Sequence, residues 1–182
     1  MGVLKSSRSP ILFLRETQKM DIQELISYEK KRADCYRLLA ACFYQPEKKI
    51  LIQENFFQNL SSLLRDFCPV AENFSNKMGT ALLDYSEEDL SVEYAKLFIG
   101  PYELKAPPYG SVYLDGVRRV MGDSTMEVIG IYQEAGLAID DEFKELPDHI
   151  AVELEFLYYL IYKEVEALEK YGIDQALNFI RH

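Results

Sequence analysis

The residues best suited to chemistry in this 182-residue chain lie in one short stretch, Glu145 to His149. A histidine beside carboxylates is a common side-chain set for acid–base catalysis, because imidazole titrates near neutral pH. Pro147 favours the first turn of a helix, so Asp148 and His149 are expected at a helix N-terminus. The helix dipole favours a carboxylate there and disfavours a protonated imidazole, which marks this histidine as a functional candidate.

The residue pattern gives little support to metal binding, nucleophilic catalysis or phosphate binding. His149 and Glu153 share a helical face, but the second histidine, His182, is the last residue, and HExxH is absent. Glu-x-x-His pairs on two helices, as in carboxylate metal sites, are also absent. No GxSxG elbow surrounds Ser111, and no glycine-rich phosphate loop occurs. We therefore expect no metal site and no bound cofactor.

A second stretch, Tyr94 to Gly116, joins an apolar helical end to an unusual loop. Tyr94, Leu97 and Phe98 recur at spacings of three and four and so share one helical face. The loop holds Pro101, Tyr102, Pro107, Pro108, Tyr109 and Tyr113. Prolines lower loop entropy and tyrosines supply rigid apolar faces with a polar tip. Such a loop suits a groove for an apolar peptide, or a lid packed on the core.

Charge and cysteine content narrow the class of partner. The chain has 30 acidic and 20 basic residues, a formal net charge of −10. This argues against nucleic acid and anionic membranes as partners and permits a basic partner. No apolar run is long enough for stable membrane insertion. The three cysteines, with no CxxC pair, predict neither disulfides nor a zinc site and favour a reducing cytoplasm.

Helical periodicity dominates the rest of the chain and predicts an all-α, single-domain helical bundle with a long Pro/Tyr-rich loop between central helices. Residues 1–20, basic with the short apolar run PILFL, are interpreted as a poorly ordered extension, with Met20 as an alternative start. Residues 21–182 are assigned to the helical domain. The expected helices cover about 21–44, 50–67, 70–85, 86–100, 123–136, 147–171 and 174–181.

Local signals set several of these ends. Asp21 with Glu24 is a capping-box-like start, Ser86 with Asp89 is a start signal, and Asp123-Ser124 is expected to cap a further helix. Gly136 and Gly172 are expected stops, because glycine readily adopts the left-handed cap conformation. The segment GSVYLDG is compatible with a short extended stretch.

The two stretches resemble the TorD/DmsD/NarJ family of maturation chaperones for molybdenum oxidoreductases. The family's first signature, an aromatic residue, two variable positions and Leu-Phe, is matched by Tyr94, Leu97 and Phe98. Its Pro-Pro-aromatic-x-Ser-x-Tyr segment is matched by Pro107, Pro108, Tyr109, Ser111 and Tyr113. Its Glu-x-Pro-Asp-His signature is matched by Glu145, Pro147, Asp148 and His149. Many relatives carry Trp in place of Tyr94 and Tyr109, whereas this chain has none.

The resemblance implies an all-helical chaperone that is not an enzyme. Such chaperones bind the twin-arginine signal peptide, or a comparable N-terminal segment, of the catalytic subunit of a molybdopterin oxidoreductase and delay export until cofactor insertion. The implied peptide-binding residues are Tyr94, Leu97, Phe98, Tyr102, Pro108, Tyr109, Ser111, Tyr113, Glu145, Asp148 and His149. The tyrosines and Phe98 are expected to contact the apolar run of the peptide, Asp148 and neighbouring acids to face its arginines, and His149 to bind backbone carbonyls or orient Asp148.

Several alternatives stay open on sequence grounds. The client of the chaperone is either exported or, as for NarJ, not exported. An enzyme using His149 with Glu145 or Asp148 would require a closed pocket, and a helical scaffold would leave the two stretches far apart. Relatives usually continue beyond the equivalent of FIRH, so the chain is either shortened or covers the exposed face by forming a homodimer. No phosphate motif supports a nucleotide site.

Overall fold

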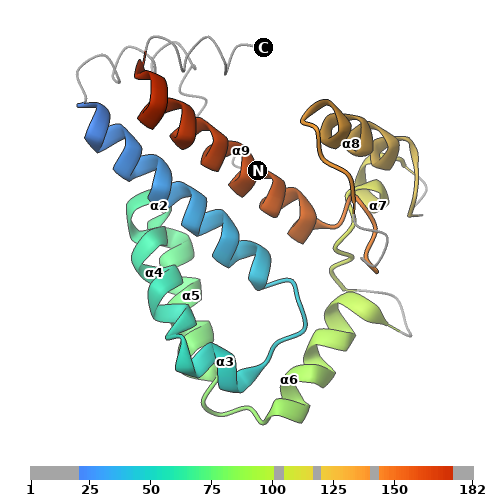
Figure 1. Cartoon of the computed structure of the whole chain (residues 1–182). Helices are drawn as coiled ribbons and strands as arrows, with labels where there is room; N and C mark the ends of the chain where they lie inside the picture. Colours follow the sequence, from blue (N-terminus) through green and yellow to red (C-terminus); the bar gives the residue numbers. More distant parts are fainter. Residues whose placement is uncertain (1–20, 101–104, 117–119, 140–143, 174–182) are drawn as a thin grey trace, which may run out of the picture.

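Two long antiparallel helices set the frame of the structure (Figure 1). The computed structural model describes residues 21–100, 105–116, 120–139 and 144–173. Helix α2 (Ile22–Ala41) packs along α9 (Ile150–Tyr171). Leu25, near the start of α2, shares a core cluster with Val165, near the end of α9. Conversely, Tyr44, just beyond α2, stacks its ring on His149 at the start of α9. The end of α2 and the start of α9 therefore meet.

A charged network also links these two helices. The Arg32 guanidinium lies 2.6 Å from the carboxylate of Glu29 and 3.3 Å from that of Glu164 across the interface. Glu29 is only 1% exposed. Burial raises the pKa of Glu29 and of Glu164, because the low-dielectric surroundings disfavour their charged forms. A single cation thus compensates two carboxylates between the helices.

A second layer covers α2 on the side away from α9 (Figure 1). It consists of α3 (Lys48–Gln53), α4 (Phe56–Phe67) and α5 (Pro69–Ala81), with α4 contacting both α2 and α5. The buried core between them is made by Cys35, Phe56, Phe57, Leu60, Leu64 and Leu82. The apolar face of α4 recurs at helical spacing, which is why this helix is amphipathic and packs as the middle element.

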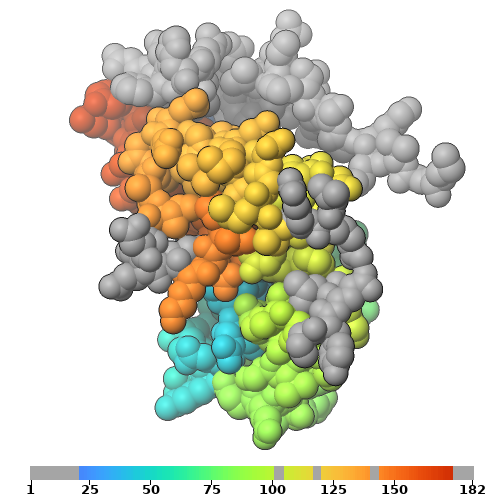
Figure 2. All heavy atoms as spheres, turned by 90° about the vertical axis from the view of Figure 1, so that its right-hand side faces the viewer, coloured from blue at the N-terminus to red at the C-terminus, as the bar shows by residue number. Residues whose placement is uncertain are grey.

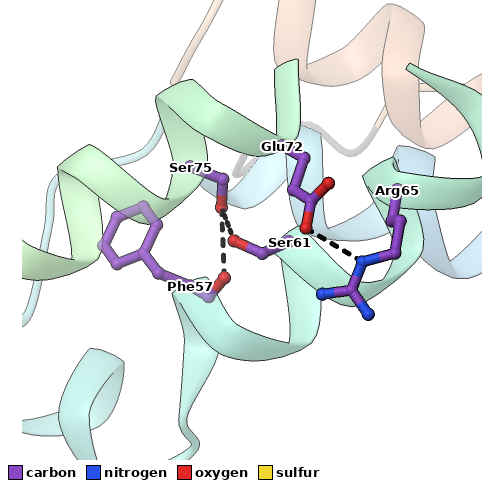
Figure 3. Close-up of polar contacts among 5 residues, drawn as sticks. All are labelled: Phe57, Ser61, Arg65, Glu72 and Ser75. Carbon is purple, nitrogen blue, oxygen red and sulfur yellow. Dashed lines mark hydrogen bonds and ion pairs between the residues drawn. The ribbon is translucent and has the colours of Figure 1, made fainter. Parts of the chain in front are cut away.

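Small side chains let α4 and α5 approach closely (Figure 3). Ser61 Oγ donates a hydrogen bond to Ser75 Oγ at 2.9 Å, and Ser75 Oγ donates to the Phe57 carbonyl at 3.1 Å. Both serines are buried, so these bonds satisfy their hydroxyl groups. A Cβ atom added at Gly79 would lie 2.9 Å from Phe57 Cβ. The spacing between these helices therefore depends on serine and glycine.

Helix α6 (Glu87–Tyr94) carries the apolar side chains that reach the candidate site. Its start lies where it was expected and is a capping box, in which Asp89 N–H donates to Ser86 Oγ and Ser86 N–H donates to the Asp89 carboxylate, both at 3.0 Å. The helix continues as a π-helical turn, η1 (Ala95–Ile99), and ends at Gly100 with φ 94°. The wider π turn was not anticipated from the periodicity, which fits a continuous α-helix equally well.

The chain beyond the Pro/Tyr-rich loop contains two short helices. Ser111–Leu114 form the single turn α7, so the extended stretch considered for this segment is wrong. Helix α8 (Asp123–Glu134) has Gly122 at its N-cap position. The Asp115 carboxylate accepts hydrogen bonds from Ser124 N at 3.2 Å and Ser124 Oγ at 3.1 Å. A carboxylate from the preceding turn, rather than the expected Asp123-Ser124 pair, thus caps α8.

The all-α prediction is confirmed, with no strand among the described residues, but some helix ends differ from expectation. The run expected as one helix over 50–67 is divided because Asn55 adopts φ 49°, in the left-handed region. Helix α9 begins later than Pro147, because His149 is its N-cap. Asp21 precedes α2 without a capping side-chain hydrogen bond. The glycine stops are confirmed, with φ 74° at Gly136 and 75° at Gly172.

Two predicted segments, the extension over residues 1–20 and the helix at 174–181, lie outside the described residues. The assignment of residues 21–182 to one domain stays a prediction. Of the described helices, none combines the length and apolarity needed to cross a membrane.

Candidate functional site

The Pro/Tyr-rich loop and the segment before α9 meet through main-chain hydrogen bonds. Gly110 N–H donates to the Asp148 carbonyl at 2.9 Å, and Ile150 N–H donates to the Pro108 carbonyl at 2.8 Å. Together these bonds form an isolated antiparallel bridge between Tyr109 and His149. Figure 2 shows the orange residues before α9 between the yellow loop and the cyan and green ends of α2 and α6. Both sequence-predicted stretches thus belong to one region of the surface.

Asp148 links the two segments through a buried hydrogen bond. It is 1% exposed, and its Oδ2 accepts a hydrogen bond from Ser111 N–H at 2.8 Å. Ser111 is fully buried at the start of α7. A charge-assisted bond of this kind in a low-dielectric site is strong. Its other oxygen, Oδ1, is buried with no hydrogen-bond partner among the described residues. The expected contact of Asp148 with the arginines of a bound peptide stays a prediction.

His149 also has a structural task. It is 2% exposed, and its Nδ1 accepts a hydrogen bond from Ala151 N–H at 3.1 Å, which caps α9. An accepting Nδ1 carries no proton, so the neutral imidazole has its proton on Nε2, which can donate but not accept. The ring is therefore suited to bind a carbonyl oxygen. It is poorly suited to act as a general base.

Aromatic rings and burial control the charge of His149. The Tyr44 ring lies parallel to the imidazole, with centroids 6.5 Å apart, and the Tyr109 ring meets it edge-on at 5.4 Å. Burial lowers the pKa of His149, and the nearby carboxylates of Glu145, Asp148 and Glu155 oppose this shift only in part. The neutral form is thus favoured, which agrees with its capping bond.

Two glutamates frame this aromatic group. Tyr109 hydroxyl donates to Glu145 Oε2, and Tyr44 hydroxyl donates to Glu155 Oε1, both at 2.9 Å. Burial, together with the bond to Glu145, raises the pKa of Tyr109 to about 12. Burial and Glu155 also raise the pKa of Tyr44 above its usual value. Both hydroxyls therefore stay protonated and hold the carboxylates in place next to His149.

An apolar pocket of about 420 Å³ opens beside this group. Its walls come from the end of α2, from α3, α4 and α5, and from α6 and η1. The lining residues are Ala41, Cys42, Tyr44, Pro46, Leu51, Phe56, Phe57, Met78, Ala81, Leu82, Tyr85, Leu90, Glu93, Tyr94, Leu97 and Phe98. Three of the predicted site residues, Tyr94, Leu97 and Phe98, thus line one pocket. Among the described lining residues Glu93 is the one charged side chain, and it pairs with Lys96 at 2.6 Å.

Side-chain contacts anchor the α6 side of this pocket. Tyr94 hydroxyl donates to the Phe43 carbonyl at 3.0 Å, and the Phe98 ring packs against Phe43 and Tyr94 at centroid distances of 5.8 and 5.2 Å. Leu97 keeps 37% of its surface exposed. Tyr44 lines the pocket and also stacks on His149, so it connects the pocket with the Glu145–Glu155 region.

The remaining predicted site residues have different surroundings. Pro108 is buried and contributes its carbonyl to the bridge. Tyr113 is 64% exposed, and its hydroxyl donates to the Pro107 carbonyl at 2.9 Å. Tyr102 lies outside the described residues. Among the residues that are described, no group of three or more His, Cys, Asp and Glu is arranged to hold a metal ion.

Sequence reasoning missed Tyr44 and Glu155. Tyr44 lies at the end of a helix with no motif around it, and Glu155 is one of several acids on an amphipathic helix. Only the meeting of α2 and α9 brings them together.

The chain is similar to known proteins over much of its length. The family model described as nitrate reductase delta subunit matches residues 58–182. A Haemophilus influenzae protein named "Probable Tat proofreading chaperone DmsD" is 30% identical over 148 residues, covering 80% of this chain and 73% of the relative. The Tat proofreading chaperone DmsD of Salmonella typhi is 32% identical over 121 residues, 62% of this chain and 55% of that protein. Chaperone protein TorD of Aliivibrio salmonicida is 30% identical over 149 residues, 77% and 68% of the two chains.

A solved structure gives a weaker likeness. It is described as a candidate redox enzyme maturation protein from Archaeoglobus fulgidus and covers 79% of both chains, with 24% identity and a TM-score of 0.49.

Proposed function

Because the chain belongs to the nitrate reductase delta subunit family, which includes TorD, DmsD and NarJ, we propose that it is an assembly chaperone and not an enzyme. Its client is the catalytic subunit of a molybdopterin oxidoreductase. It binds the twin-arginine signal peptide of that subunit and delays export until the cofactor is inserted. Its relatives are named as chaperones, two of them for Tat proofreading, which supports this role.

The observation that carries the proposal is the junction itself. The Tyr109–His149 bridge brings the loop and the start of α9 next to Tyr44, which also lines the apolar pocket. A twin-arginine peptide has a cationic pair followed by a moderately apolar run. Carboxylates beside an apolar pocket complement both parts, and the net charge of −10 favours encounter with a cationic peptide.

The site residues take three roles in this proposal. Tyr94, Leu97 and Phe98 contact the apolar run of the peptide. Glu145, rather than the buried Asp148, faces an arginine, and His149, which is also buried, holds the Tyr44 and Tyr109 rings in place beside it. Pro108, Tyr109, Ser111 and Asp148 hold the two segments in place. Tyr102 and Tyr113 are proposed as outer contacts.

The other readings of the sequence have less support. An acid–base enzyme needs a histidine nitrogen that accepts a proton, and Nδ1 of His149 already accepts the Ala151 N–H. A scaffold without a site would leave the two stretches apart, whereas they are hydrogen-bonded. A chaperone for a client that is not exported remains the second candidate, favoured by the family's description as nitrate reductase delta subunit.

Peptide binding tests the proposal. Fluorescence anisotropy is measured with a labelled twin-arginine peptide, the same peptide with both arginines changed to glutamine, and a plain N-terminal segment of a cytoplasmic oxidoreductase. We expect Phe98→Ala to weaken binding of the twin-arginine peptide by tenfold or more. Val92→Ala, on the exposed surface of α6 away from the pocket lining, serves as control. Equal binding by both variants contradicts the site, and preference for the plain segment supports the second candidate.

The proposal also covers the cellular compartment and the oligomeric state. We propose a cytoplasmic location, supported by the free thiols of Cys35, Cys42 and Cys68, which suit a reducing compartment. Formation of a homodimer stays a prediction. The exposed apolar side chains of α9 that would suit it are Leu157, Leu160 and Tyr162.

A further inference from the structure

The pocket beside Tyr44 is lined by more residues than those of the sequence motifs. Tyr94, Leu97 and Phe98 form only its α6 wall. The opposite walls are made by residues outside either motif, among them Cys42, Leu51 and Leu82. Burial raises the pKa of the Cys42 thiol to about 11, so this wall is uncharged at neutral pH. A volume of about 420 Å³ lies within the range of small ligand pockets, and the lining is apolar, as such pockets require.

The carboxylates near the pocket include those of Glu93, Glu145 and Glu155. Glu93 is exposed on α6 and pairs with Lys96 Nζ at 2.6 Å, and Glu155, which is also exposed, accepts a hydrogen bond from the Tyr44 hydroxyl. Glu145 accepts a hydrogen bond from Tyr109, whose ring meets His149 edge-on. Among the described residues no lysine or arginine lines the pocket, although Lys48 Nζ donates to the carbonyl of the lining residue Tyr85. The carboxylates of Glu145 and Glu155 therefore favour a cation beside the pocket, whereas the described lining inside it is apolar.

We propose that this pocket takes a bulky apolar side chain of the client segment, which enters across Tyr44 while a neighbouring arginine stays at the Glu145 and Glu155 carboxylates. The inference rests on the proposed function and adds a specificity: the walls at Cys42, Leu51 and Leu82 select for the size of one apolar residue.

The occupant follows from charge and from continuity with the junction. Tyr44 is a single side chain that contacts His149 on one side and lines the pocket on the other. An extended peptide rises about 3.3 Å per residue. Two peptide residues that lie on opposite sides of the Tyr44 ring are therefore on the order of two to four positions apart in the peptide. A segment with arginine followed closely by leucine, isoleucine, methionine or phenylalanine fits both parts. A purely apolar or an acidic segment does not.

A pocket-filling substitution tests this assignment. Ala81 lines the pocket at the exposed end of α5, so Ala81→Phe adds bulk to the pocket without changing the buried core. Thr80→Phe adds the same ring at the preceding position, which is exposed and does not line the pocket. Met78→Trp is a second filling variant, because Met78 lines the pocket with 47% of its surface exposed. Circular dichroism verifies that each variant is folded.

Two labelled peptides separate the pocket from the rest of the site. One has two arginines followed by a leucine-rich run, and in the other every leucine is alanine. We expect wild type and Thr80→Phe to bind the leucine peptide at least tenfold more tightly than the alanine peptide. The filling variants should lose that preference and bind the alanine peptide as wild type does.

The outcomes are distinguishable. If wild type binds the leucine peptide and the filling variants bind it equally well, the pocket assignment is wrong and the proposed function stands. If wild type binds neither peptide, the proposed function fails and the assignment fails with it. If the filling variants change only the oligomeric state, measured by light scattering, the pocket seats a second copy and the assignment is wrong. If deletion of residues 1–19 from wild type tightens binding of the leucine peptide, and the same deletion has no effect in a filling variant, the pocket seats that segment instead.

Discussion

Tyr109 and His149 lie opposite each other in an antiparallel bridge, although they come from distant parts of the chain. The bridge joins the Pro/Tyr-rich loop to the N-cap of α9, and the two rings meet at a centroid distance of 5.4 Å. The local conformation of each stretch therefore depends on the other. Substitutions at this junction are expected to separate effects on folding from effects on binding.

Asp148 is expected to stabilise the fold more than it contributes to peptide affinity. Its carboxylate accepts the Ser111 N–H at a buried position, and losing a hydrogen bond to a charged group costs about 1.5–3 kcal/mol. Asp148→Ala should lower the free energy of unfolding by this amount in urea denaturation. Asp148→Asn keeps an accepting oxygen and should cost less. A variant with wild-type stability and tenfold weaker peptide binding would show that Asp148 contacts the peptide after all.

His149 should make stability depend on pH near neutrality. Burial places the pKa of folded His149 below its usual 6.5, so between these two values the unfolded chain binds more protons than the folded chain. The stability due to neutral His149 is therefore complete above about pH 6.5 and falls as the pH drops through that value. His149→Asn, which can still cap a helix, should remove this component.

The measurement is the urea midpoint of both proteins between about pH 5 and 8. Burial raises the pKa of Glu153 as well, and this shift acts in the opposite sense, since its contribution falls as pH rises above the usual carboxyl value. It is common to wild type and variant and cancels in their difference. Parallel curves would mean that His149 has the same pKa in the folded and unfolded chain.

Two glycines should respond oppositely to alanine. At Gly79 the added Cβ would lie 2.9 Å from Phe57 Cβ, so Gly79→Ala forces α4 and α5 apart and should cost about 1–3 kcal/mol. At Gly130, within α8, the added Cβ has no neighbour within 4 Å, and Gly130→Ala should stabilise by about 0.5–1 kcal/mol. Thermal unfolding by circular dichroism measures both. Equal effects would show that the α4–α5 contact adapts freely.

Removing the cation between α2 and α9 should be costly at neutral pH. Arg32→Met leaves the carboxylates of Glu29 and Glu164 without their partner, and breaking a buried ion pair costs about 3–5 kcal/mol. We expect the lower end of this range, because the Arg32 side chain is 36% exposed. The loss should diminish as the pH falls towards 5, since burial has already raised the pKa of Glu29, and protonation removes the uncompensated charge.

Arg37→Met provides the matched control for this experiment. Arg37 pairs with Asp34 on the surface of the same helix, where both side chains are more than half exposed. Such pairs contribute at most about 0–1 kcal/mol. A loss at Arg37 as large as that at Arg32 would mean that helix propensity, and not the buried network, explains the effect.

The sequence predicted the features that depend on local chemistry. The capping box at Ser86 and the stop at Gly136 follow from residue types at fixed spacing, and both are present. The break at Asn55 and the π turn at Ala95–Ile99 were not predicted, because an apolar pattern does not distinguish a continuous helix from one with a local irregularity.

The candidate site was predicted in part for a similar reason. The motifs locate the wall at Phe98 and the N-cap at His149, but periodicity carries no information on which residues of other helices face them. Tyr44 was therefore missed. The burial of Asp148 was also missed, because the N–H that it accepts belongs to Ser111 in another segment.

The meeting of α2 with the start of α9 has a consequence for biosynthesis. Tyr44 leaves the ribosome long before Glu155, its hydrogen-bond partner, has been translated. Until α9 emerges, α2 lacks the helix against which it packs, and the carboxylates of Glu145 and Glu155 beside Tyr44 and Tyr109 are still missing. The proposed binding site is therefore completed only after α9 has been synthesised and has packed against α2.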